Sequence, residues 1–249
     1  MRVRYAPANA KLARLAARLG VEVYSFDMLS GVTCPGAKDC KSWAEVQDDG
    51  SRRIADGKHT VFRCFSASQE AQYDNVFDFR EENTQAALSL AASSPMKCAS
   101  ALVAAIPEDA AVIRPHVAGD YKLLNYFDAW LEVCNRRPDM RFYAYTKMLP
   151  FWVKRRDVIP SNLALTASRG GRWDHLISEH GFRESVVCYS EQQADDLGLE
   201  IDHDDHHAYS LTGGSFALLI HGTQPKGSEA GKAVRALRGT GSYNRKVMV

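Results

Sequence analysis

The chain has 249 residues, of which 45% are hydrophobic and 24% are charged, and its formal net charge is +1. These values are ordinary for a folded globular protein, and the balanced charge gives no general indication of a nucleic-acid or membrane partner. No apolar run reaches the length that spans a bilayer, and the basic N-terminus lacks the apolar block of a signal peptide. We therefore expect a cytoplasmic protein with no membrane partner.

The N-terminal segment, residues 1–20, predicts an amphipathic helix. Asn9 is a suitable N-cap residue, and Leu12 and Leu15 fall on one stripe at helical spacing. Gly20 can end the helix in the left-handed conformation that glycine adopts readily.

Short segments rich in Val, Ile, Leu and aromatic residues alternate with helical patterns along most of the remaining chain. Such alternation predicts parallel strands joined by helical crossovers. The six predicted strands cover residues 21–26, 110–117, 140–146, 162–168, 185–190 and 215–221.

We interpret residues 1–249 as a single α/β domain. Its main part, residues 21–225, is expected to form a six-unit βα partial (TIM-like) barrel with parallel strands; an open doubly wound sheet is the alternative. A long helical insertion that begins with a cysteine-bearing loop, residues 31–109, follows the first strand. A C-terminal helix and tail, residues 226–249, complete the chain.

The insertion contains a polar segment and two helical stretches. The first stretch, over about residues 66–92, opens with a sequence typical of a capping box, in which Ser66 would pair with Gln69. The second covers residues 96–106.

Polar and reactive side chains follow all six predicted strands. In parallel βα folds the active site lies at the carboxyl ends of the strands, so these side chains are expected to share one site. The candidate substrate- or cofactor-binding residues are His116, Gly119, Asp120, Lys147, Arg169 and His221.

Cys34, Cys40 and Cys64 are the candidate metal ligands, because none of them lies on an apolar helical stripe. Cysteines in a cytoplasmic chain are expected to stay reduced, which favours metal or redox chemistry over a disulfide. Arg63 is expected to lower the pKa of the neighbouring Cys64 thiol. Cys188, at the end of the fifth strand, is the candidate fourth ligand.

The spacing of these cysteines differs from that of common zinc sites. Five residues separate Cys34 from Cys40, and 23 separate Cys40 from Cys64, whereas structural zinc sites use tighter pairs. Iron–sulfur clusters accept more varied loops, so a cluster, most simply 4Fe-4S, is the expected cofactor. Cys98 and Cys134 share patterns with apolar residues and are expected in the core.

A second run of metal-ligand types, residues 202–207 ("DHDDHH"), is interpreted as a solvated turn. Adjacent loop residues rarely all reach one ion, although His203 or Asp205 can still contribute to the mouth of the predicted barrel. P-loop, Rossmann, nucleophile-elbow and zincin motifs are absent from the sequence.

Several long segments resemble an uncharacterised family of bacteriophage proteins, found mainly in phages of actinobacteria and named as numbered gene products. The segments include "TCPGAKDC", "HVAGDYKLLNYFDAWLEV", "NLALTASRGGRWD" and "FALLIHGTQPKGSEAGKA", and the resemblance covers the chain from about residue 30 onward. It implies a protein that works in the host cytoplasm.

A remoter resemblance is to the radical S-adenosylmethionine superfamily, which also has cysteines after the first strand of a partial barrel. Gly119 and Asp120 match the position of that superfamily's glycine-glycine-glutamate segment, which contacts the methionine amino group. The three cysteines of that superfamily lie in one short loop, whereas Cys64 here is distant. The resemblance therefore implies a cluster more strongly than it implies S-adenosylmethionine.

The expected function is that of an iron–sulfur protein with a redox or radical role, acting on a small molecule or a host protein. One alternative is a zinc protein with a structural or host-interaction role and no catalysis. The other is a nucleic-acid-binding phage protein in which the cysteines are incidental; short basic runs such as "VKRRD" are its only support.

Overall fold

The computed structural model describes residues 2–238 of the chain. The predicted tail after residue 238 lies outside the described residues. Among the described helices none is long and apolar enough to cross a membrane.

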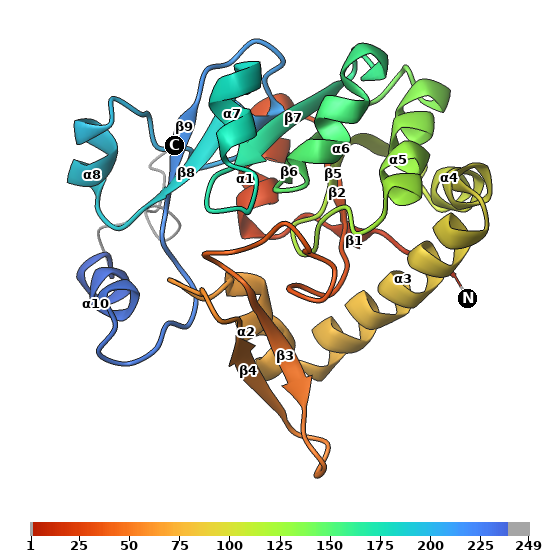
Figure 1. The fold of residues 1–249 in the computed structure, drawn as a ribbon. Helices are drawn as coiled ribbons and strands as arrows, with labels where there is room; N and C mark the ends of the chain where they lie inside the picture. Colours follow the sequence, from red (N-terminus) through yellow and green to blue (C-terminus); the bar gives the residue numbers. More distant parts are fainter. Residues whose placement is uncertain (1, 239–249) are drawn as a thin grey trace.

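A seven-stranded sheet forms the centre of the molecule (Figure 1). Six strands are parallel, and the short β1 pairs antiparallel with β2 at one edge. The sheet order is β1 (Ala6–Pro7), β2 (Glu22–Phe26), β5 (Ala110–Pro115), β6 (Arg141–Thr146), β7 (Leu163–Ser168), β8 (Glu184–Cys188) and β9 (Phe216–Leu219).

The predicted α/β fold with a mainly parallel sheet is confirmed, and each of the six predicted strands is found within a few residues of its expected position. The parallel strands follow one another across the sheet in chain order, without the reversal that a doubly wound sheet requires. β1 and β9 are the edges of the sheet, and we find no pairing in residues 2–238 that closes it into a barrel.

Helices cover both faces of the sheet. The large hydrophobic core lies between one face and the helices α3 to α5, with Trp130 and Phe127 of α5 fully buried. The other face packs against α1 and α9 through Leu12, Leu15 and Phe216. The helices outside the insertion are α1 (Ala10–Leu19), α5 (Leu124–Arg136), α6 (Leu149–Lys154), α7 (His175–His180), α8 (Glu191–Asp196), α9 (His206–Tyr209) and α10 (Glu229–Ala236).

The predicted caps of α1 are confirmed. The Asn9 side chain accepts hydrogen bonds from the backbone amides of Lys11 and Leu12, and Gly20 ends the helix with φ 67°. Leu12 and Leu15 are completely buried, so one face of this helix anchors it to the sheet.

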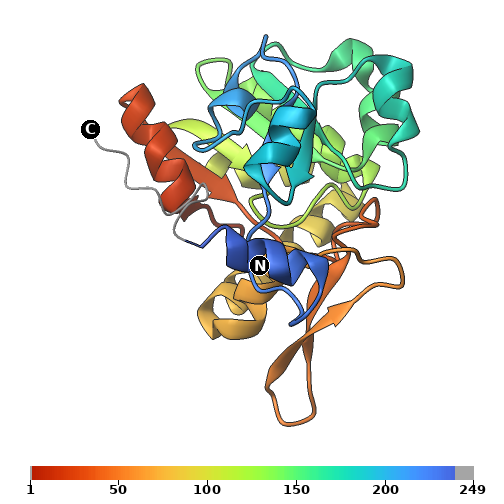
Figure 2. The ribbon, with the colours of Figure 1, turned by 90° about the vertical axis from the view of Figure 1, so that its left-hand side faces the viewer.

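The insertion contains a hairpin that the sequence analysis interpreted only as a polar segment. Its strands β3 (Ser42–Val46) and β4 (Arg52–Asp56) pair in register from Ser42 opposite Asp56, and both views show the hairpin projecting from the molecule (Figures 1 and 2). The strand sequences "SWAEV" and "RRIAD" do not alternate between apolar and polar residues, so the usual strand signal was absent.

Three helices follow the hairpin: α2 (Phe65–Gln72), α3 (Asp74–Ser93) and α4 (Pro95–Ala104). The predicted capping box is wrong. The N-cap residue of α2 is Cys64, and Ser66 lies inside the helix with its hydroxyl donating to the carbonyl of Val117. The predicted single helix over residues 66–92 is interrupted at Tyr73, whose backbone is extended.

Candidate functional site

A cavity of about 430 Å³ lies at the carboxyl ends of the parallel strands. Every parallel strand or the loop after it contributes to its wall, as expected for a site in this class of fold. The polar and reactive residues that line it include Cys34, Cys40, Cys64, Lys11, Arg114, His116, Asp120, Thr146, Lys147, Ser168 and His221.

The hairpin explains how Cys64 reaches the same cavity as Cys34 and Cys40. The chain leaves Cys40 along β3 and returns along β4, and beyond it the backbone amides of Val61 and Phe62 bind the carbonyl of Asp39, at 2.7 and 3.1 Å. The amide of Cys64 also donates to the Ser42 hydroxyl, at 2.9 Å. The 23 intervening residues therefore add little distance between the thiols.

The cysteine loop is packed closely against the loops after β5 and β6. A side chain on Gly36 would lie 2.5 Å from the carbonyl oxygen of Lys147, and one on Gly119, which has φ 92°, would lie 2.8 Å from the Thr33 hydroxyl. Only glycine permits these approaches. Gly119, which also lines the cavity, thus allows the cysteine loop to pack closely against the loop after β5.

A buried ion pair supports the start of the loop. Glu70 of α2 accepts hydrogen bonds from the amide and hydroxyl of Ser30, and Arg80 of α3 donates to the same carboxylate at 3.0 Å. Both side chains are almost fully buried. Removing either partner would leave an uncompensated charge, so this pair fixes α2, α3 and the loop relative to one another.

The thiols interact electrostatically. Burial raises the pKa of Cys34 well above the ordinary thiol value, and the neighbouring charges of Asp120, Cys64 and Cys40 raise it further. Burial and Cys40 raise the pKa of Cys64 to about 11, although the backbone amides of Ser66 and Ala67 act in the opposite direction. In the absence of a cation the Cys34 and Cys64 thiols are therefore neutral near pH 7.

The expected influence of Arg63 on Cys64 is wrong. The Arg63 guanidinium binds both carboxylate oxygens of Asp56, at 2.7 to 3.0 Å, and this pairing directs its charge away from the thiol. A cation that does contact the cysteine loop is Lys41, whose ammonium group donates to the carbonyls of Gly31 and Cys34. Burial lowers the pKa of Lys41, whereas the Cys34 and Cys40 thiolates would raise it.

The other three cysteines lie elsewhere. Cys188 packs with Ala194 and Leu219 beneath α8 and does not line the cavity. Neighbouring residues of a strand point to opposite faces of the sheet, and on β8 it is Val187 that lines the cavity. Cys98 and Cys134 are buried in the large core, as expected. All six cysteines are free thiols. Within residues 2–238 we find no group of three or more His, Cys, Asp or Glu side chains arranged to hold a metal ion.

Asp120 and Lys147 connect neighbouring strand ends. The Asp120 carboxylate accepts hydrogen bonds from the Thr146 hydroxyl at 2.7 Å and the Lys147 amide at 2.9 Å. Burial raises its pKa, and these hydrogen bonds lower it. The Lys147 ammonium group donates to the carbonyls of Ser168 and Arg169, at 2.8 and 2.6 Å. Both side chains line the cavity, yet their polar atoms are largely occupied by the protein itself.

The two predicted histidines both line the cavity, in different surroundings. The His116 ring is buried among Tyr121, Tyr126 and Trp130, and its Nε2 lies 3.0 Å from the Tyr126 hydroxyl. Burial and the Arg114 charge lower its pKa to about 3. Its φ of 66° is uncommon for a residue with a side chain and concentrates at functional or tightly constrained positions.

The His221 ring packs on Phe65 with a centroid distance of 4.6 Å. Burial lowers its pKa to about 4, and the charges of Lys11 and Arg114 act in the same direction. Arg169, in contrast, is not part of the cavity wall. Its guanidinium pairs with Glu184 on the outside of the sheet.

The sequence analysis missed a buried ion network at one end of the cavity. Lys11 of α1 and Arg114 of β5 both bind the Asp205 carboxylate, Lys11 at 2.6 Å. The hydroxyls of Tyr143 and Tyr145 donate to the same carboxylate, at 3.0 and 3.1 Å. Arg114 was a detectable signal, because a charged residue inside an apolar strand segment needs a buried partner.

The interpretation of residues 202–207 as a solvated turn is therefore wrong for two of its three carboxylates, those of Asp202 and Asp205. Asp202 and Asp205 are completely buried. Arg114 and Lys11 lower the pKa of Asp205, whereas burial raises the pKa of Asp202, whose carboxylate lies 4.0 Å from Lys11. Asp205 has φ 63°, and this turn directs its carboxylate inward.

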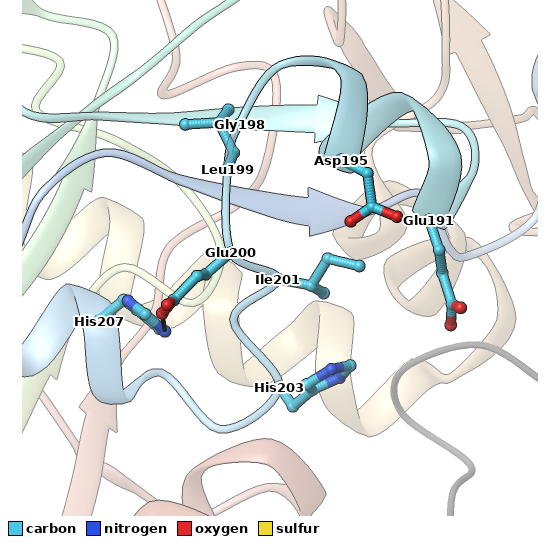
Figure 3. Close-up of a pocket in the computed structure, with 8 residues that line it drawn as sticks. All are labelled: Glu191, Asp195, Gly198, Leu199, Glu200, Ile201, His203 and His207. Carbon is cyan, nitrogen blue, oxygen red and sulfur yellow. Dashed lines mark ion pairs between the residues drawn. The ribbon is translucent and has the colours of Figure 1, made fainter.

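His203 and His207 of the same run face a different, open groove of about 620 Å³ (Figure 3). His207 lies 3.4 Å from Glu200, and His203 lies below them near the α8 side chains. The groove is lined by Glu191, Asp195, Gly198, Leu199, Glu200, Ile201, His203 and His207. His203 consequently does not reach the cysteine cavity.

Residues 4–239 match the family model described as "Gene product 88". The chain belongs to this family. The resemblance to a family of numbered phage gene products is thus supported. No curated protein and no solved structure matches the chain, and nothing in these comparisons supports similarity to the radical S-adenosylmethionine superfamily.

Proposed function

We propose that this Gene product 88 protein binds an iron–sulfur cluster through Cys34, Cys40 and Cys64 and uses it in a redox or radical reaction on a small molecule. The supporting observation is that three cysteines from two separate loops line one cavity at the carboxyl ends of six parallel strands. When bound, such a cluster supplies one-electron chemistry.

The surroundings of the thiols suit an anionic cluster. Lys41 contacts the loop between Cys34 and Cys40, and the charges of Lys122 and Arg172 lie close enough to lower the pKa of Lys41. Metal ions deprotonate coordinating thiols, so the raised thiol pKa values favour the empty, protonated state only until metal is available. The thiols are not arranged around a single ion, and a cluster does not require that arrangement, because each cysteine binds a separate iron.

Among residues 2–238 three cysteines line this cavity, so one iron of a 4Fe-4S cluster would lack a cysteine ligand. An open iron of this kind favours catalysis over simple electron storage. The chain-order sheet of six parallel strands is consistent with a partial barrel like that of radical S-adenosylmethionine enzymes. The Asp120 carboxylate, however, is already bound to Thr146 and Lys147, which weakens the case for S-adenosylmethionine.

The test is purification of the full chain without oxygen, followed by its visible spectrum and by iron and sulfide analysis. We expect a brown protein with roughly four irons and four sulfides per chain, as in a cubane cluster. Replacing Cys34, Cys40 or Cys64 singly with alanine should abolish most of the colour. Cys98→Ala and Cys188→Ala are the matched controls and should retain it.

Three results would contradict the proposal. One is a folded, colourless, iron-free protein after reconstitution with iron and sulfide. Another is stoichiometric zinc held by the same cysteines, which would support the structural zinc alternative. The third is loss of the cluster in Cys188→Ala with retention in Cys64→Ala, which would move the site away from the cavity.

A further inference from the structure

Cys40 and Cys64 are held near each other at the base of the β3–β4 hairpin by one buried side chain. The Ser42 hydroxyl accepts a hydrogen bond from the amide of Cys64 at 2.9 Å, and it donates to the carbonyl oxygen of Cys40 at 3.5 Å. Ser42 is completely buried. The amide of Val61 donates to the carbonyl of Asp39 at 2.7 Å. The two segments that carry the cysteines therefore run side by side.

The two thiols face the same cavity. Both cysteines line it and both are partly exposed, so a small reagent in the cavity can reach them. Burial raises the pKa of Cys64 to about 11, and the charge of Cys40 is the next largest cause. Electrostatic effects of this kind weaken with distance, which indicates that the two sulfurs are close.

Cys34 is held by different neighbours. Its carbonyl accepts a hydrogen bond from the Lys41 ammonium group at 2.9 Å, and its loop packs on the loops after β5 and β6. After burial, the charge with the largest effect on the pKa of Cys34 is that of Asp120, ahead of either thiol. Cys40 and Cys64 are therefore the pair best placed to react with each other.

The positions of Cys40 and Cys64 are compatible with a disulfide after a small shift. A disulfide joins residues whose Cα atoms lie roughly 4.4–6.8 Å apart. The bridge through the Ser42 hydroxyl keeps the two Cα atoms no more than a few ångströms beyond this range. Cys64 precedes α2 and Cys40 lies in the turn before β3, so neither residue is inside a helix or strand that would resist the shift.

We propose that Cys40 and Cys64 form a reversible disulfide in the metal-free protein, and that this disulfide fixes the base of the hairpin. The disulfide and the proposed cluster would use the same two sulfurs, so each would exclude the other. Loading of the cavity would then require prior reduction, and the hairpin base would act as a redox-sensitive switch. The disulfide itself does not depend on the proposed cluster.

The reaction is thiol–disulfide exchange with a small-molecule disulfide such as oxidised glutathione. The thiolate of one cysteine attacks a sulfur of the reagent, forms a mixed disulfide and releases one glutathione thiolate. The second protein thiolate then attacks the protein sulfur of the mixed disulfide and releases the second glutathione. Two electrons pass from the two protein thiols to the reagent, and their two protons pass to the released thiolates or to solvent.

The test measures this equilibrium on the full chain after removal of metal with a chelator. The protein is equilibrated with mixtures of reduced and oxidised glutathione, quenched with acid, alkylated and digested for mass spectrometry. Trypsin cleaves after Lys38, Lys41 and Arg63, so the three cavity cysteines fall on different peptides.

We expect one cross-link, between the peptides of Cys40 and Cys64. The effective concentration of these thiols should be at least roughly a hundredfold higher than in urea, because the folded hairpin base holds them together. A flexible chain supplies only about a millimolar effective concentration.

Cys34→Ala is the matched control and should keep the cross-link. Cys64→Ala should abolish it and leave Cys40 as a free thiol or as a mixed disulfide with glutathione. Ser42→Ala should lower the effective concentration of the pair roughly fivefold, because the hydroxyl that contacts both backbones is lost.

The proposal is overturned if the only products are mixed disulfides with glutathione, if the cross-link contains Cys34, or if the effective concentration is no higher than in urea. Reconstitution with iron and sulfide separates this proposal from the cluster. A cross-link in a protein that never binds iron supports the disulfide alone, and iron binding without a cross-link supports the cluster alone. If both form, the oxidised protein should bind iron only after reduction; iron binding without reduction would overturn the switch.

Discussion

The cysteine cavity and the open groove beside α8 both contain metal-ligand residue types, but these residues are far apart in sequence in the cavity and adjacent in the groove. The cavity gathers Cys34, Cys40 and Cys64 from positions up to 30 residues apart. The groove borders the run "DHDDHH", in which metal-ligand types are adjacent, yet the structure divides them: Asp202 and Asp205 are buried, whereas His203 and His207 line the groove. Density of ligands along the chain is therefore a poorer guide to a site than their position relative to strand ends.

The two regions also differ in how their charges are held. Asp205 is buried and binds two cations, whereas Asp195 in the groove is exposed. A buried ion pair loses much more when one partner is removed than an exposed charge does, because the remaining charge is desolvated without compensation. Stability measurements can therefore test whether the regions are as different as their geometry indicates.

The largest effect is expected for Asp205→Asn. Asparagine tolerates the left-handed backbone at this position, so the substitution removes the charge without adding strain. Lys11 and Arg114 would lose their shared anion, and the free energy of unfolding should fall by about 3–5 kcal/mol. Urea unfolding measures the change.

Asp195→Asn is the control for this prediction, and its unfolding free energy should stay within about 0.5 kcal/mol of the parent value. A change of similar size in both variants would show that burial does not distinguish the regions. A negligible change in Asp205→Asn would mean that the ion network contributes no net stability.

A smaller effect is expected from the protonation of His116. Burial holds its pKa at about 3 in the folded protein, against about 6.5 in the unfolded chain. Between these values only the unfolded chain binds the proton, so stability decreases as the pH falls below about 6.5. The contribution of this group between pH 7 and pH 5 is about 2 kcal/mol.

Urea unfolding of His116→Asn over the same pH range checks this expectation. Asparagine also accepts positive φ, so the substitution adds no backbone strain. Because asparagine does not titrate, the change in stability between pH 7 and pH 5 should become smaller by about 2 kcal/mol, whatever the lost packing costs. Part of the slope should persist, because the pKa of His221 is also lowered, to about 4. An unchanged slope in His116→Asn would contradict the assignment.

The strands were predictable from sequence because each is a short apolar segment bounded by turn residues. The segment "NLALTAS", which contains β7, is an example. Their parallel order followed from the helices between them. The hairpin β3–β4 was not predictable in this way. Its two segments lack the apolar alternation that marks a strand, and its importance lies in returning the chain to Cys64.

The site was predictable only in part, for a related reason. Lys147 and His116 follow strands directly, and strand ends could be located. Lys11 and Asp205 reach the cavity from α1 and from the turn before α9, which depends on how α1 packs across the sheet. Such long-range packing leaves no local pattern. Arg169 shows the converse, since a strand-end position did not decide the direction of its side chain.

The smallest effect is expected for Glu200→Gln in the groove. The carboxylate is 83% exposed and lies 3.4 Å from His207, so water and salt screen the pair (Figure 3). Loss of the pair should change the unfolding free energy by less than about 0.5 kcal/mol at pH 6, and added salt should reduce the difference further. Urea unfolding at low and high ionic strength measures both quantities. A loss of more than about 1 kcal/mol would show that the groove holds its charges in a fixed arrangement, as the cavity does. The contrast between the cysteine cavity, where charges are held in place, and the solvent-exposed groove would then be wrong. The groove would merit the same metal analysis as the cysteine cavity.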